Sequence, residues 1–89
     1  MSERQVTIGS KVGLHARPAS LFVKAVKDTG VPVKIAKDGN PPVNAASMLS
    51  VLTLGAEFGD AVTISAEGDG ADAALDELAA LLASDLDAE

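Results

Sequence analysis

The sequence predicts an α+β fold in which a small antiparallel sheet is covered on one face by helices. Short segments in which apolar and polar residues alternate are typical of half-buried strands. Longer segments with apolar residues three and four positions apart are typical of amphipathic helices. These segments follow one another as strand, helix, strand, strand, helix, strand and helix, without an internal repeat. Four strands backed by three helices, an open-faced β-sandwich, would bury the apolar stripes.

Length and composition limit the size of the core. The chain has 89 residues, of which 47% are hydrophobic and only 2% aromatic. We therefore expect residues 1–89 to form a single domain, with a core of Val, Ile, Leu and Ala side chains and two Phe residues. A domain of this size buries a modest share of its surface, so we expect modest stability.

The first strand is predicted at residues 5–8, where polar and apolar residues alternate. A helix is predicted next, up to about Lys27, because Pro18 is tolerated in the first turn of a helix, where its missing N–H costs nothing. Gly30 provides the stop. The apolar residues at helical spacing place one face of this helix in the core: Ala19, Phe22, Val23 and Val26.

A pair of strands is predicted after this helix. Apolar residues alternate with others over residues 31–36, and Asp38-Gly39 is a strong signal for a hairpin turn. The returning strand, residues 41–44, begins with two prolines. Because proline cannot donate a hydrogen bond to the ladder, this strand is expected at an edge of the sheet.

A short, apolar second helix is predicted at residues 46–54, with Asn44 or Ser47 as a cap near its start and Gly55 closing it. Its apolar side chains cannot all face one core, so we expect some of them to remain exposed. These side chains are Met48, Leu49, Val51, Leu52 and Leu54.

The last two elements are a strand at residues 61–66, where alternation returns, and a third helix from Gly70 onward. One apolar stripe runs along this helix, with acidic residues outside it. The stripe consists of Ala74, Leu75, Leu78, Leu81 and Leu82. How the four strands pair within the sheet does not follow from these patterns.

Charge and composition exclude several classes of function. The net charge is −6, with the acidic residues concentrated from Asp60 to Glu89 and the basic residues mostly before residue 38. A nucleic-acid-binding protein needs a basic stripe, so we expect no nucleic acid partner. One histidine and no cysteine argue against a transition-metal site, and the acidic residues lack the spacing of a calcium loop. We expect no metal and no cofactor.

The absence of cysteine also removes disulfides and thiol catalysis, and it is compatible with a reducing compartment. Nowhere do about 18 apolar residues follow one another, so no membrane insertion is expected. These two features predict a soluble cytoplasmic protein.

The single histidine, His15, lies directly before the predicted start of the first helix. Unpaired backbone N–H groups and the helix dipole stabilise an anion at such a position. A neutral imidazole is nucleophilic near pH 7 and suits reversible phosphoryl transfer. Arg17 can offer a planar fork to phosphate oxygens, and Gly13 allows close approach of the backbone. The residues alone leave open that His15 is only a surface or capping residue.

Two longer motifs favour the hypothesis that His15 takes part in phosphoryl transfer. The first surrounds the histidine: Gly13-Leu14-His15-Ala16-Arg17-Pro18-Ala19. The second is Val43-Asn44-Ala45-Ala46-Ser47-Met48-Leu49, continuing to Thr53-Leu54-Gly55-Ala56. They resemble the active-site motif and the regulatory-serine motif of the HPr family, the histidine-containing phosphocarrier proteins of the bacterial phosphoenolpyruvate:sugar phosphotransferase system. The order of elements matches as well, so the resemblance covers nearly the whole chain.

The resemblance implies a function and its partners. His15 would accept a phosphoryl group at Nδ1 from phosphorylated enzyme I and pass it to sugar-specific IIA proteins or domains, with Arg17 as the partner of the phosphate. The chain would then be a carrier and a substrate of enzymes, not an enzyme itself. Because it must leave one partner for the next, a monomer with transient interfaces is expected.

The resemblance also assigns roles around the second motif. Ser47 would correspond to the serine that a dedicated kinase phosphorylates in some bacteria. Many regulated members of the family carry a basic residue before this serine and a glycine three residues after it, where this chain has Ala46 and Ser50. A helix-capping hydroxyl is an equal alternative. The apolar residues expected to form a docking surface around the histidine are Leu21, Met48, Leu49 and Leu52, with core packing as the alternative for each.

Two other functions remain open at this point. The first is a regulatory binding module on the same fold that docks partners without carrying phosphate, which the presence of His15 disfavours. The second is a carrier in a parallel, nitrogen-related phosphorelay, which nothing in the sequence excludes. Incubation with enzyme I and phosphoenolpyruvate separates a carrier from a binding module.

Overall fold

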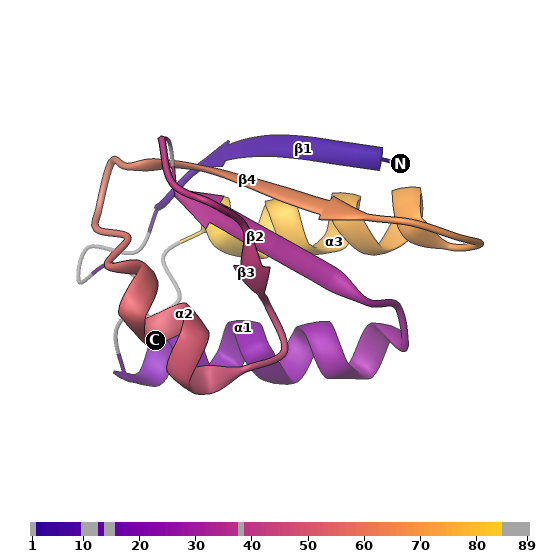
Figure 1. Cartoon of the computed structure of the whole chain (residues 1–89), viewed down its shortest axis with the longest axis horizontal. Coiled ribbons are helices and arrows are strands. Elements are labelled where there is room, and N and C mark those ends of the chain that lie inside the picture. The colour runs from indigo at the N-terminus through magenta and orange to yellow at the C-terminus, as the bar shows by residue number, and fades with distance from the viewer. Residues whose placement is uncertain (1, 10–12, 14–15, 38, 85–89) are drawn as a thin grey trace.

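The computed structural model describes residues 2–9, 13, 16–37 and 39–84. Within these residues the order of elements is the predicted one, and the predicted fold class is confirmed (Figure 1). The strands are β1 (Ser2–Thr7), β2 (Val33–Lys37), β3 (Val43–Asn44) and β4 (Ala61–Ala66). The helices are α1 (Ala16–Thr29), α2 (Met48–Leu54) and α3 (Ala71–Ala83).

The strands form one antiparallel sheet in the order β1-β4-β2-β3. β4 therefore lies at the centre and pairs with β1 on one side, from Ser2 opposite Ala66 to Thr7 opposite Ala61, and with β2 on the other. β3 is an edge strand, as predicted. Its two prolines precede the strand and do not lie within it, so the ladder loses no donor to them.

The core lies between the sheet and the helices. Inward-facing residues of β2 and β4 alternate with more exposed ones, which gives the sheet one buried face. Phe22, the one buried aromatic residue among those described, packs with aliphatic side chains, as the composition predicts. The helical residues that complete this core are Ala19, Val23, Val26, Val51, Ala71, Leu75, Leu78 and Leu82.

The ends of β1 and β2 differ from the prediction. β1 begins at Ser2 and not at Gln5, because the central strand β4 supplies a partner for every residue from Ser2 onward. Ile8 is buried but follows the end of β1. β2 begins at Val33, two residues later than the alternation indicates. Alternation reports which side chains are buried, whereas strand ends depend on where a partner strand stops.

The ends of the helices follow from local polar contacts. α1 continues to Thr29, past the predicted end at Lys27, and the Thr29 hydroxyl donates a hydrogen bond to the Val26 carbonyl at 2.6 Å. α2 begins two residues later than predicted because Ser47 is its cap. In the predicted hairpin turn, Gly39 adopts a φ of +84°, and Asp38 lies outside the described residues.

The helices of the described residues are not long and apolar enough for any of them to cross a membrane. The same part of the chain holds no group of three or more His, Cys, Asp or Glu side chains that could bind a metal ion.

Candidate functional site

The start of α1 is the centre of the candidate site. α1 begins at Ala16, so His15 is the residue directly before the first helical residue, although His15 itself lies outside the described residues. Pro18 is fully buried in the first turn, where its missing N–H leaves no donor unpaired. The first turn contains no acidic residue, so no side chain there offsets the positive end of the helix dipole. The position directly before α1 therefore favours an anion.

Gly13, two residues before His15, has a backbone conformation that favours glycine. Its φ is +74°, in the left-handed region that favours glycine, and the residue is buried. Leu14, the other motif residue between Gly13 and His15, lies outside the described residues. A side chain at position 13 would strain the backbone two residues before His15.

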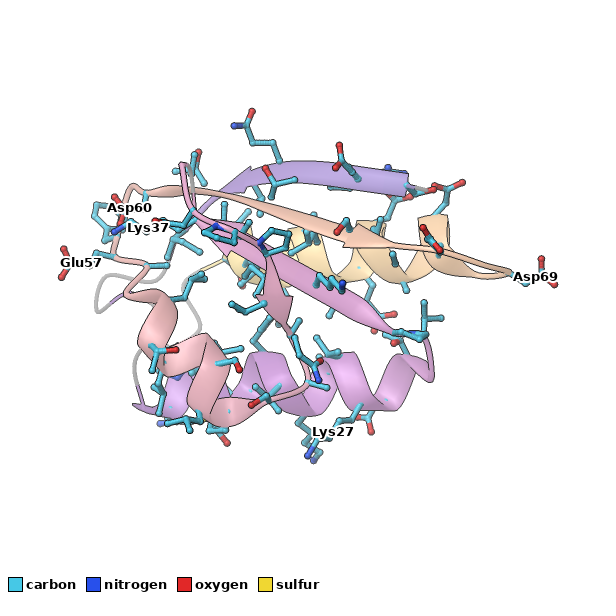
Figure 2. The ribbon with its side chains drawn as sticks, in the orientation of Figure 1. Lys27, Lys37, Glu57, Asp60 and Asp69 are labelled. Atoms are coloured by element: carbon cyan, nitrogen blue, oxygen red, sulfur yellow. The ribbon has the colours of Figure 1, made fainter. Side chains whose placement is uncertain are left out.

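The exposed side of α1 carries basic residues. Arg17 lies in the first turn and is exposed, and Lys24 is exposed further along the helix. Lys27 is exposed as well and points away from the rest of the molecule (Figure 2). Leu21 is four residues after Arg17 and three before Lys24, so it lies on the same side of the helix. Its side chain is 39% exposed. This side of α1 thus combines one apolar residue with a basic border.

α2 carries the second part of the candidate site. Ser47 is its N-cap, with an extended backbone and an Oγ that accepts a hydrogen bond from the Ser50 N–H at 3.3 Å. The predicted capping role of Ser47 is confirmed. Asn44, the other candidate cap, instead accepts a hydrogen bond from the Ala46 N–H at 2.9 Å.

Two of the three leucines of α2 are exposed, as predicted from the excess of apolar residues. Leu49 is 73% and Leu52 is 36% exposed, while Val51 is the buried residue of the helix. The alternative that these side chains pack in the core is therefore wrong for Leu21, Leu49 and Leu52. Met48 is partly buried and packs against the core. Since α1 and α2 are in contact, these exposed leucines belong to neighbouring helices. Leu21, Met48, Leu49 and Leu52 are the residues expected from the sequence to dock partners, and we call them the docking surface.

Sequence reasoning missed the contacts at the other end of α2. Gly55, with a φ of +70°, ends the helix, and its carbonyl accepts a hydrogen bond from Lys37 Nζ at 3.3 Å. The same ammonium lies 3.3 Å from Asp60 Oδ2. The backbone N–H of Glu57 and then the charge of Lys37 lower the pKa of Asp60 below its ordinary value. No local pattern links Lys37 to Asp60, because Lys37 ends β2 whereas Asp60 lies in the segment between α2 and β4.

A family model described as the PTS HPr component phosphorylation site matches residues 2–84. The chain belongs to the HPr family. The match includes both motifs, from Gly13 to Ala56, and it gives the protein the role of a phosphocarrier in the phosphotransferase system.

Similar proteins of known name support the assignment to the HPr family. The chain is 55% identical over 87 residues to the phosphocarrier protein HPr of Streptomyces coelicolor. The matched region covers 98% of this chain and 94% of that protein. The crystal structure of HPr-C-His from Thermoanaerobacter tengcongensis matches with a TM-score of 0.90 at 39% identity and covers 100% and 99% of the two chains. An HPr dimer from the same organism matches with a TM-score of 0.68 at 41% identity, covering 91% and 92%.

Proposed function

We propose that His15 accepts a phosphoryl group from phosphorylated enzyme I and passes it to IIA proteins or domains of the phosphotransferase system. The observation that carries this proposal is the position of His15 directly before Ala16, where α1 begins. The protein acts as a monomeric carrier in the cytoplasm and is a substrate of enzymes, not an enzyme. It needs neither a metal nor another cofactor.

Each transfer exchanges one bond to phosphorus for another. A neutral ring nitrogen of His15 attacks the phosphorus atom, the new N–P bond forms, and the bond between phosphorus and the donor breaks. In the second transfer the acceptor attacks and the N–P bond to His15 breaks. Backbone N–H groups of the first turn of α1 stabilise the phosphoryl oxygens, and Arg17 adds a positive charge on the same turn.

The docking surface brings the partners to His15. Exposed leucines on α1 and α2 offer an apolar centre, and Lys24 and Lys27 provide a basic border. Interfaces of short-lived complexes combine a small apolar centre with a polar rim. Such a surface suits a partner with an apolar patch and acidic residues, and it allows enzyme I and IIA to bind in turn.

The test is incubation of the pure protein with enzyme I and phosphoenolpyruvate, followed by mass measurement before and after acid treatment. We expect a gain of one acid-labile phosphate on the wild-type chain and none on His15→Ala, because the N–P bond is labile in acid and the bond-forming nitrogen is gone. A phosphorylated His15→Ala protein would remove His15 from the mechanism.

A matched variant separates the roles of the two motif residues. Arg17→Ala should slow the transfer without abolishing it, because Arg17 stabilises charge and forms no bond to phosphorus. Transfer at the wild-type rate would contradict this role of Arg17.

We also propose a regulatory role for Ser47, through phosphorylation by a serine kinase. The cap leaves the Ser47 side chain partly exposed next to Met48 of the docking surface. A phosphate there adds close to two negative charges near pH 7. That charge would meet any partner that covers the apolar surface, so phosphorylation of Ser47 would weaken docking.

A further inference from the structure

The C-terminal end of α2 is held by a side chain from the sheet. Lys37, the last residue of β2, donates a hydrogen bond from Nζ to the Gly55 carbonyl at 3.3 Å and pairs with Asp60 Oδ2 at 3.3 Å. Figure 2 shows Lys37 and Asp60 next to each other, beyond the C-terminal end of α2. We call Lys37, Gly55 and Asp60 the α2 clamp.

α2 depends on such contacts because it is too short to be stable by itself. It has seven residues, whereas isolated helices shorter than about 12 residues are marginal in water. Val51 is its buried residue, and no basic residue lies in its last turn. Lys37 supplies, from another element, the cation that the negative end of the helix dipole favours.

Asp60 fixes the segment that follows α2. The carboxylate oxygen that pairs with Lys37 also accepts a hydrogen bond from the Glu57 N–H at 2.9 Å. The Asp60 carbonyl accepts one from the Ile8 N–H at 2.9 Å, and the Ile8 carbonyl accepts one from the Gly59 N–H at 3.0 Å. The segment 55–60 is thus tied to β2 on one side and to the end of β1 on the other.

We infer that Lys37 and Asp60 are positioning residues for partner docking, because they fix the orientation of α2 and with it Leu49 and Leu52 of the docking surface. This inference rests on the proposed function. Neither residue belongs to the docking surface or to the phosphoryl site. The clamp therefore affects how tightly partners bind, and it leaves the rate of transfer within the bound complex unchanged.

The experiment measures enzyme I-dependent phosphorylation against carrier concentration, which separates KM from kcat. Lys37→Met keeps the aliphatic stem and removes the ammonium. We expect it to raise KM about fivefold, the size expected for one partly exposed ion pair, with kcat unchanged. Lys37→Arg should restore the wild-type KM, because the guanidinium can also donate to the Gly55 carbonyl and pair with Asp60.

Two variants at position 60 separate its charge from its hydrogen bond. Asp60→Asn keeps an oxygen that can accept from the Glu57 N–H and loses the charge, whereas Asp60→Ala loses both. We expect a smaller rise in KM for Asp60→Asn than for Asp60→Ala. Equal, wild-type KM values for both would contradict a positioning role for Asp60.

The matched control is Arg4, whose ion pairs with Asp72 and Asp76 tie β1 to α3. Arg4 Nε lies 2.9 Å from Asp76 Oδ1, and the Arg4 side chain is about as exposed as that of Lys37. Arg4→Met should lower the melting temperature at least as much as Lys37→Met and leave KM unchanged. An equal rise in KM for both would mean that general destabilisation, and not the position of α2, controls docking.

A measurement without any partner completes the design. Amide hydrogen exchange in Lys37→Met should become faster within α2 and the segment 55–60 and stay unchanged in α3. A wild-type chain that takes no phosphate would contradict the proposed function. A wild-type chain that is phosphorylated, together with a folded Lys37→Met of unchanged KM or unchanged exchange in α2, would contradict the positioning role alone.

Discussion

α2 and α3 are both rich in leucine, yet they place their leucines on opposite sides. α3 buries Leu75, Leu78 and Leu82, whereas α2 exposes Leu49 and Leu52. The difference follows from what lies beneath each helix. α3 packs on β1 and β4, strands of six residues each, while α2 lies over β2 and the two-residue edge strand β3. Leucine content therefore does not tell which helix buries its leucines in the core, whereas the position of the helix over the sheet does.

The largest expected effect is on stability and tests the structural half of this comparison. Leu78→Ala removes a fully buried side chain from α3 and should lower the free energy of unfolding by about 2–5 kcal/mol, because it leaves a cavity. Leu49→Ala in α2 should change it by no more than about 0.5 kcal/mol, because the side chain is mostly in water. Urea unfolding of both variants measures the two values. Similar losses would mean that the two helices do not differ in this way.

The second prediction tests the functional half. Leu49→Ser should raise the KM of the carrier for enzyme I about tenfold, the size expected when one anchor of an interface is lost, and leave the melting temperature unchanged. The matched change on α3 is Ala80→Ser, at an exposed position, and it should leave KM as it is. If Leu49→Ser docks like the wild type, α2 lies outside the interface.

Local patterns were enough to predict most of the elements. The apolar face of α1, from Ala19 to Val26, is buried as expected, and β4 has the predicted bounds. Ser47 and Gly55 lie at the two ends of α2, because capping and left-handed glycine depend on a few neighbouring residues. The excess of apolar residues in α2 also predicted an exposed surface there.

Long-range contacts were beyond prediction from the sequence. Nothing in the alternation of β1 indicates that it pairs with β4, because the same face would be buried beside any neighbour. The ion pairs of Arg4 and Lys37 join elements far apart in the chain and leave no periodic signal. For the site, the phosphoryl role of His15 stays a prediction from its motif, whereas the contact of Lys37 with the end of α2 required the structure.

The third prediction concerns the start of α2. Ser47→Asp should fold normally, because aspartate caps as well as serine and a negative charge is favourable at a helix N-terminus. It should accept phosphate more slowly, mainly through a higher KM, since enzyme I would have to desolvate the new charge beside Met48. Phosphorylation against carrier concentration, with a thermal melt, measures both effects.

Ser47→Ala is the control for this change. It removes the hydrogen bond to the Ser50 N–H without adding charge, so it should cost about 0.5–2 kcal/mol of stability and leave KM near the wild-type value. An unchanged KM in a well-folded Ser47→Asp would place Ser47 outside the docking surface.

The smallest expected effect is on the pH dependence of stability. It concerns one aspartate beside each of the two helices α2 and α3. The hydrogen bond from the Ser2 side chain and then the charge of Arg4 lower the pKa of Asp72, at the start of α3, below its ordinary value of 3.8. The pKa of Asp60, beyond the end of α2, is lowered as well. A lowered pKa means that the folded state favours the ionised carboxylate. The stability from each group is therefore complete above the unfolded pKa and is lost as the pH falls through the folded pKa.

Asp72→Asn and Asp60→Asn should each melt slightly below the wild type at pH 7, with gaps that close as the pH falls below 3.8. Asp72 is exposed and Asp60 is partly exposed, so both gaps should be small. Melting curves from pH 7 to pH 2.5 measure them, and a gap that widens in acid would contradict the direction of the pKa shift. At neutral pH only Asp60→Asn should also raise KM, because Asp60 supports the docking helix and Asp72 supports α3. Two aspartates with the same direction of pKa shift would then differ in function through the helix that each one holds.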